Sequence, residues 1–493
     1  MNRLKISSVV LLMAALSSCK KFSDFQSNPN NPVTSDPALL LTNLERTAFS
    51  NINTDAPLAS RQLVYTQSAS NAQYYGWQRG SFNYASVSQT VKMEQEAART
   101  GNANYRYLAR FLRAYYVVGM TQMFGDIPYS QMMQSIAGNN FTDTLALRPA
   151  YDKQQDVYLG VLNELKVISD SLSTTALGIS GDVIYSGNIN QWKKLVNSFT
   201  LRVLMNLSKK ESNTTLNIKQ RFADIVSQPA KYPLLGSNAD NGQLPYYNVT
   251  GNQYVYFNDN GMKTDYYLDS SFVKLLKDNA DPRLFVFGEP ATKTGLSAGN
   301  FAAYDGLVGS APLAYNVSKK SDGKSSQIHK RFAYDATNEP SVLMGYAELQ
   351  FVLAEAALRG WISGDANAYY KKGVEASLTF SNYQSTYSAI SIADYLNRPE
   401  LNLKAGTELQ QIITQKYISM FMNSGMQLFF EQRRTGYPAF ETAGAGILNG
   451  GKVPKRWMYP ASEYNTNATN VNKAVSSQYN GTDDINGTMW LIQ

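Results

Sequence analysis

Hydrophobic residues recur every three or four positions in several long stretches of this chain. Such spacing places them on one face of an α-helix, which can then pack against a core. We predict helices over 36–50, 105–123, 152–172 and 191–207. Asp36 and Pro37 suit the start of the first helix, Asn190 suits the start of the last, and the Gly125–Pro128 turn ends the second.

The segment from Tyr346 to Thr379 forms the clearest repeat unit. Its 34 residues match the length of a tetratricopeptide helical hairpin, and small residues stand where two helices must approach closely. Thr407 and Gln410 form a capping-box pattern before another helix, and a further helix is expected over 425–434. The other helices do not repeat cleanly, so regular and degenerate repeats both stay open. The predicted fold class is mainly α, with a tetratricopeptide-like helical-repeat scaffold.

Between about 231 and 340 the helical periodicity is lost, and Gly, Asn, Asp and Tyr dominate. We expect a large insertion of irregular loops and short strands here, apart from one helical stretch over 272–277. Such long irregular segments are unusual inside a compact domain and commonly carry function. The prediction is a single domain over 36–493, in which a helical scaffold (about 36–230 and 341–440) supports an irregular ligand face.

The first nineteen residues have the features of a secretion signal. Two basic residues precede an apolar stretch of eleven residues, which is too short to cross a bilayer as a helix. Leu16-Ser17-Ser18-Cys19 resembles a bacterial lipobox, in which the cysteine becomes the lipidated first residue. We therefore predict a signal peptide over 1–18, lipidation of Cys19 and a flexible tether over 19–35. The alternative is an ordinary cleaved signal with an incidental cysteine.

The composition argues against several classes of protein. One cysteine, Cys19, and one histidine, His329, are too few for a Cys/His zinc site, and we expect neither a metal nor a cofactor. Its polar neighbours indicate that His329 lies at the surface. The formal charge of +7 becomes +5 when Arg3 and Lys5 leave with the signal, and the remaining basic residues are scattered. A nucleic-acid-binding groove is therefore not expected.

Aromatic residues in polar loops are the most distinctive candidates for a binding site. Tyr and Trp combine a flat apolar face with a hydrogen-bonding tip, which suits the faces and hydroxyl rims of sugar rings. Tyr74, Tyr75 and Trp77 lie in one such loop, and Tyr254 and Tyr256 lie in the insertion. We predict these five as ligand-binding residues. The alternative for any single ring is that it packs its loop against the helical body.

A series of sequence features resembles the SusD/RagB family of outer-membrane lipoproteins. The features begin at the lipobox and extend to about residue 465, and no single one is diagnostic, but their order is. They include Phe111–Tyr115, Phe124–Tyr129, Trp192–Arg202, Asp281–Leu284, Ala347–Ala356, Ile412–Ile418, Arg434–Pro438 and Arg456–Pro460.

This resemblance implies a lipid-anchored protein on the surface of Gram-negative bacteria, with a tetratricopeptide-like scaffold and an irregular ligand face. It also implies that the protein caps a TonB-dependent barrel transporter of the SusC type. Members of the family capture glycans, or sometimes peptides, and hand them inward without cleaving them. We therefore predict a non-catalytic glycan-binding protein of the outer membrane, with an oligosaccharide and a SusC-like transporter as partners. The family's binding residues do not transfer to individual positions of this chain.

Two other functions remain open from the residues alone. A concave helical-repeat surface can bind peptides or proteins, so a peptide- or protein-binding scaffold at the outer membrane is the main alternative. Glycoside hydrolysis needs only two carboxylates about 5 to 9.5 Å apart, a geometry that a sequence does not reveal.

Overall fold

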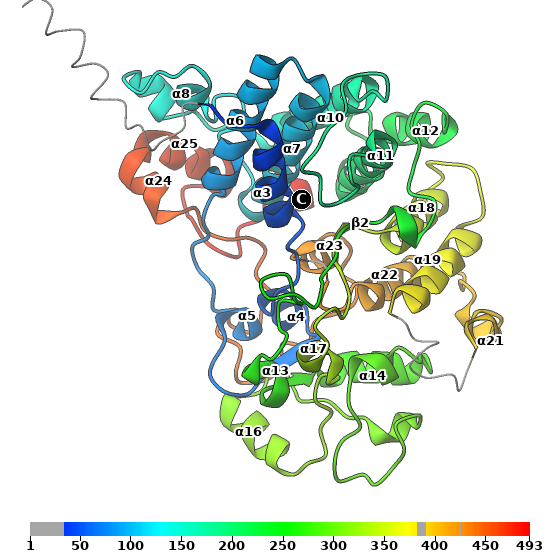
Figure 1. Ribbon diagram of the computed structural model, residues 1–493. Coiled ribbons are helices and arrows are strands. Elements are labelled where there is room, and N and C mark those ends of the chain that lie inside the picture. Colours follow the sequence, from blue (N-terminus) through cyan, green and yellow to red (C-terminus); the bar gives the residue numbers. More distant parts are fainter. Residues whose placement is uncertain (1–33, 382–390, 424) are drawn as a thin grey trace, which may run out of the picture.

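The computed structural model describes residues 34–381, 391–423 and 425–493. Cys19 and nearly all of the expected signal and tether lie outside these residues. The described chain is mainly helical, as predicted, with the long helices in an arc and the short elements gathered below it (Figure 1).

The N-terminal helices form the first half of this arc. Asp36 caps the first of them, accepting a hydrogen bond from the Ala38 amide, and Gly101 takes the left-handed conformation that turns α6 into α7. The cap of α11 is Asn188, not Asn190 as predicted, because the Asn188 side chain accepts from the amides of the next turn. The helices are α3 (Pro37–Ala48), α4 (Asp55–Ala59), α5 (Asn71–Tyr74), α6 (Tyr84–Thr100), α7 (Ala103–Phe124), α8 (Gln134–Ala137), α9 (Thr144–Leu147), α10 (Gln154–Ser171), α11 (Ile189–Asn206) and α12 (Ile218–Ser227).

The long helices between residues 346 and 435 complete the arc, and the last two helices of the chain lie back beside its first half (Figure 1). The predicted repeat unit is a helical hairpin of α18 and α19, in which Gly373 allows close approach, since a Cβ there would lie 2.8 Å from the Phe351 ring. The predicted capping box is not formed, because the Thr407 hydroxyl donates to the Lys404 carbonyl instead. The helices are α18 (Tyr346–Leu358), α19 (Ala366–Phe380), α21 (Ile392–Leu396), α22 (Glu408–Ser419), α23 (Gln427–Thr435), α24 (Ala461–Thr466) and α25 (Ala468–Tyr479).

Residues 231–340 contain only short elements. Their helices are α13 (Asn260–Thr264), α14 (Ser270–Asp278), α15 (Leu284–Phe287), α16 (Leu313–Ser321) and α17 (Arg331–Tyr334). Two antiparallel strand pairs join this segment to the rest: β1 (Leu63–Tyr65) with β3 (Tyr266–Leu268), and β2 (Gly242–Leu244) with β4 (Ser341–Met344). Both strands of the insertion lie in about its first third, so the strand pairs fasten that part to the scaffold.

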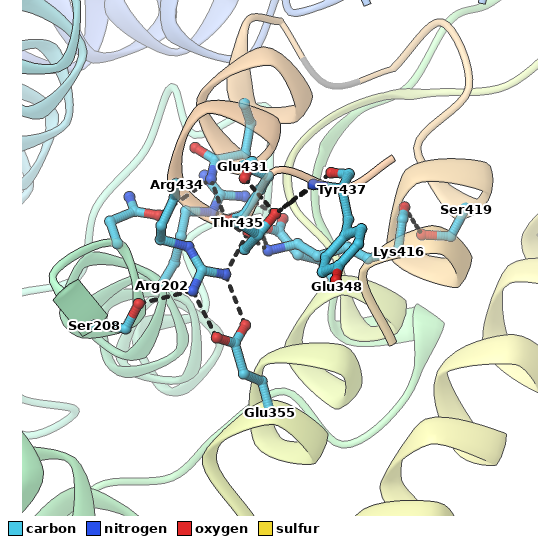
Figure 2. A network of polar contacts seen from close by, with 12 residues as sticks. Arg202, Ser208, Glu348, Glu355, Lys416, Ser419, Glu431, Arg434, Thr435 and Tyr437 are labelled. Atoms are coloured by element: carbon cyan, nitrogen blue, oxygen red, sulfur yellow. Dashed lines mark hydrogen bonds and ion pairs between the residues drawn. The ribbon is translucent and has the colours of Figure 1, made fainter. Parts of the chain in front are cut away.

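Six charged side chains are buried where α11, α18, α22 and α23 meet (Figure 2). Three are positive and three are negative, and none of their side chains is more than 6% exposed. We call this set the buried charge network; its members are Arg202, Lys416, Arg434, Glu348, Glu355 and Glu431.

The buried charge network is a continuous chain of ion pairs. Arg202 donates to Glu348, with 2.8 Å between Nε and Oε1, and Lys416 Nζ lies 3.5 Å from Glu348 and 3.1 Å from Glu431. Arg434 then donates to Glu431 at 2.6 Å and to both oxygens of Glu355 at 2.6 Å. Burial alone would raise the pKa of Glu431, but Arg434 and Lys416 lower it to about 2. Each charge thus depends on its neighbours to remain buried.

Glu45 and Asp182 place two carboxyl groups together beside α3. Asp182 accepts hydrogen bonds from the Trp192 indole at 2.8 Å and from the Gly187 amide at 2.8 Å, which suits a carboxylate. Glu45 accepts only one, from the Val183 amide at 2.7 Å, and its other oxygen has no partner among the described residues. Burial and the neighbouring Asp182 raise the pKa of Glu45 to about 10. Glu45 therefore keeps its proton at neutral pH.

Removing one charge from the buried charge network should be costly. Glu431→Gln leaves Lys416 and Arg434 buried with one negative partner fewer, and we expect a loss of about 3 to 5 kcal/mol in the free energy of unfolding, measured by urea denaturation. The matched control is Lys274→Ala in the exposed Lys274–Asp278 pair, which should cost no more than about 0.5 kcal/mol. Equal losses for the two variants would contradict the role of the network.

Glu45 should make the protein less stable as the pH rises. The pKa of Glu45 is about 10 in the folded state and about 4.3 in the unfolded chain. The protonated side chain therefore adds its full contribution to the free energy of unfolding below about pH 4.3, and this contribution is lost as the pH rises toward about 10. Glu45→Gln should therefore flatten the decline in unfolding free energy between pH 5 and pH 9. The exposed Glu375→Gln serves as a control, and identical pH profiles for Glu45→Gln and the parent chain would refute this assignment.

Candidate ligand-binding site

The structure buries four of the five aromatic residues that were predicted to bind ligand. Tyr74 is 3% exposed, Tyr75 0%, Trp77 8% and Tyr254 2%. The expectation that these four rings face solvent is therefore wrong, and a sugar ring cannot stack on them in this conformation. Tyr256 is half-buried and keeps part of its ring at the surface.

The loop around Tyr75 and Trp77 is pinned to the body by its own aromatic rings. The Arg61 guanidinium lies 4.3 Å from the centre of the Tyr75 ring, and the Tyr75 hydroxyl donates to the Ala59 carbonyl at 3.0 Å. Trp77 stacks on Trp457 with 4.8 Å between ring centres. These contacts satisfy both the apolar faces and the polar tips, so the packing alternative holds for this loop.

Tyr254 has the same supporting role in the insertion. Its ring meets the Tyr246 ring edge-on with 5.4 Å between centres, and the Phe332 ring lies 6.4 Å away. The neighbouring Tyr256 ring packs at 6.2 Å from Tyr254. Tyr254 thus forms the buried support on which Tyr256 rests.

Tyr256 belongs to a group of three half-buried tyrosines, which we call the tyrosine cluster: Tyr65, Tyr256 and Tyr266. Tyr65 and Tyr266 face each other across the β1–β3 pair, with ring centres 4.8 Å apart and a 30° angle between the planes. The Thr54 side chain lies near the phenols of Tyr256 and Tyr266. The cluster therefore presents adjacent flat rings with their hydroxyl groups close together.

The phenols of Tyr256 and Tyr266 stay neutral at physiological pH. Burial raises the pKa of Tyr256 to about 12, against the opposing effect of Thr54, and Tyr266, Asp259 and Asp55 raise it further. Burial likewise raises the pKa of Tyr266. Neutral phenols both donate and accept hydrogen bonds, and the two carboxylates beside them add acceptors. This set of groups matches the hydroxyl groups of a carbohydrate.

Two exposed aromatic residues flank the tyrosine cluster along the chain. Tyr247 is 58% exposed and lies in the loop that leads to Tyr256. Tyr334 is 60% exposed at the end of α17, which packs on α13, and Lys263 Nζ lies 5.2 Å from the centre of its ring. The insertion thus also carries exposed aromatic rings.

Sequence reasoning missed Tyr65 and Tyr266. Both stand in short β-prone runs, Leu63–Tyr65 and Tyr266–Leu268, and that composition was the available signal. What was missing is the pairing of two strands that lie far apart in the sequence. The expected surface position of His329 is also wrong, because the side chain is buried beside Glu289, and burial lowers its pKa to about 4.

Within residues 34–381, 391–423 and 425–493, no three His, Cys, Asp or Glu side chains are grouped so that they could hold a metal ion. In the same part of the chain, no helix combines the length and the apolar character needed to cross a membrane.

Comparisons with known proteins identify the family. Residues 29–460 match the family model of SusD-like proteins, described as starch-binding and associating with the outer membrane. A SusD homologue from Bacteroides fragilis is 40% identical, with a TM-score of 0.84 over 93% of this chain and 100% of the other. A protein from Bacteroides vulgatus, described as a putative outer membrane protein probably involved in nutrient binding, is 37% identical, with a TM-score of 0.83 and the same coverage.

A protein described as chitin-binding shares the fold at 24% identity, with a TM-score of 0.74 over 93% of this chain and 100% of the other. No curated protein matches the chain. The match to the family model covers most of the sequence, and the structures of its homologues have the same helical fold. The chain therefore belongs to the SusD-like family, whose model is described as starch-binding and associating with the outer membrane.

Proposed function

We propose that this protein is a lipid-anchored cell-surface receptor that binds a glycan through the tyrosine cluster and releases it unchanged to a TonB-dependent transporter of the SusC type. The observation that carries the proposal is the Tyr65–Tyr266 pair, with Tyr256 and two carboxylates beside it. Membership of a family described as starch-binding supports a carbohydrate as the ligand. The lipid anchor and the transporter follow from the resemblance of the sequence to the family.

The physical properties of the cluster suit capture followed by release. Each aromatic contact adds about 0.5 to 1.5 kcal/mol beyond area burial, so two or three rings give weak to moderate affinity. The half-buried rings of the cluster are already held by their neighbours, Tyr256 by Tyr254 and Tyr65 by Tyr266. A ligand therefore binds without a cost for ordering the side chains, and the small number of ring contacts allows it to dissociate readily.

Tyr74, Tyr75, Trp77 and Tyr254 take a supporting part in this proposal. Tyr75 and Trp77 hold the loop that follows β1, and Tyr254 supports Tyr256. Replacing any of these four acts on binding through the fold, whereas replacing Tyr65 or Tyr266 removes a contact surface.

Removing the paired rings should weaken glycan binding without unfolding the protein. We expect Tyr65→Ala with Tyr266→Ala to lower affinity about tenfold in affinity electrophoresis against starch and soluble chitin derivatives, since two aromatic contacts are lost. Phe141→Ala, which removes an exposed ring from the loop between α8 and α9, should leave retention unchanged. If the double variant is retained as well as the parent on a polysaccharide that the parent binds, the tyrosine cluster is not the site.

The anchor is tested separately. Cys19→Ala removes the thiol that would carry the acyl chains, so the variant should leave the outer-membrane fraction and should lack the lipid mass in intact-protein mass spectrometry. Exposure at the cell surface is measured by adding protease to whole cells that make the parent chain. Finding Cys19 unmodified in membrane-bound protein would contradict lipid anchoring.

A further inference from the structure

A cavity is lined mostly by residues of α10, α11 and α12 and of the turn before α12. These helices lie in the arc, in a different part of the molecule from α4 and α13, which flank the tyrosine cluster (Figure 1). Its volume is about 480 Å³, which lies in the range of sites for small ligands. The buried side chains of Leu162, Leu165 and Leu204 line its apolar part. Packing of α12 on the arc thus leaves a space large enough for a sugar-sized molecule.

Arg221 on α12 supplies a positive charge to the lining of this cavity. Its guanidinium makes one hydrogen bond, to Asn163 Oδ1 at 2.8 Å, and within the described ranges it has no carboxylate within 4 Å. A guanidinium carries five N–H donors in a planar fork that fits a carboxylate. Partial burial lowers the pKa of Arg221 because nothing nearby compensates its charge. The structure therefore leaves most of its donors unused beside a cavity.

The other charged groups around the cavity do not neutralise Arg221. Lys166 pairs with Asp170, and Lys231 Nζ lies 3.7 Å from the same carboxylate. Asp224 is exposed and accepts a hydrogen bond from Gln220 at 2.7 Å. Three positive and two negative side chains give this region a charge of +1. The cavity therefore favours a ligand with one negative charge.

Polar groups complete the lining opposite the leucines. Thr214, Thr215 and Asn217 stand at its edge, where α12 begins without a side-chain cap. Hydroxyl and amide groups of this kind pair with the hydroxyl groups of a ligand, while Leu204 and Ile225 contact its apolar faces. The lining thus combines a guanidinium, hydrogen-bonding groups and apolar side chains.

We propose that this cavity is a second binding site, specific for a small hydroxylated carboxylate such as a uronic acid, with Arg221 holding the carboxylate. The site is separate from the tyrosine cluster and stands whether or not the cluster binds glycans. A uronic acid combines a single negative charge with a hydroxylated ring of a size that fits the cavity. The protein would then distinguish acidic from neutral sugars at this position.

The experiment is calorimetric titration of the full chain in detergent with sodium glucuronate, glucose and sodium acetate at constant ionic strength. We expect saturable one-to-one binding of glucuronate, at least tenfold tighter than that of glucose or acetate, since only glucuronate engages both Arg221 and the hydroxyl-binding edge. Arg221→Gln should weaken glucuronate binding at least tenfold. Lys219→Gln removes the same charge from the same helix but lies outside the cavity lining, and it should change affinity less than twofold.

Thermal unfolding and retention on neutral polysaccharide serve as readouts of the rest of the protein. Arg221→Gln should leave the thermal unfolding and the retention on neutral polysaccharide unchanged. Among the described residues, the Arg221 side chain donates a hydrogen bond only to Asn163. Equal affinity for glucuronate and glucose, or equal losses in Arg221→Gln and Lys219→Gln, would overturn the proposal. Loss of neutral-glycan retention in the Tyr65/Tyr266 variant tests the other site and does not bear on this one.

Discussion

Charge compensation inside the helical arc is the constraint on which the rest of the structure depends. Arg202, Lys416 and Arg434 are each stable in the interior only because a glutamate from another turn or helix meets them there. Hydrophobic packing tolerates small shifts of one helix against another, but a buried ion pair does not. The network thus fixes the relative positions of α11, α18, α22 and α23. Because β4 directly precedes α18, the position of β4 is fixed with them.

The irregular segment over 231–340 is positioned by that frame through two short strand pairs. β4 leads directly into α18 and pairs with β2, while β1 pairs with β3, so the irregular segment is held at two places. Neither pair is long enough to be stable alone. The insertion therefore takes its shape from packing against the helices and from aromatic contacts such as Phe272 on Phe421.

Local patterns predicted the helices well, because a stripe of apolar residues and a cap are properties of neighbouring positions. The helix predicted over 105–123 is α7, Ala103–Phe124, and the proposed hairpin over 346–379 is α18 with α19. Aromatic residues in polar loops carried no such signal, because Tyr75 looks the same in sequence whether or not Arg61 covers it. Tyr65 and Tyr266 were beyond reach for a related reason, since only strand pairing across the fold brings them together.

Under the proposed function, glycan binding depends on the pairing of residues 65 and 266, and only the complete fold brings these residues together. Contacts between such distant positions form late, after the loop between them has closed. A chain that has formed its individual helices but not yet docked the insertion holds two isolated tyrosines and no platform. Under the proposed function, such a chain would not bind glycan until the insertion has docked and the two rings have paired.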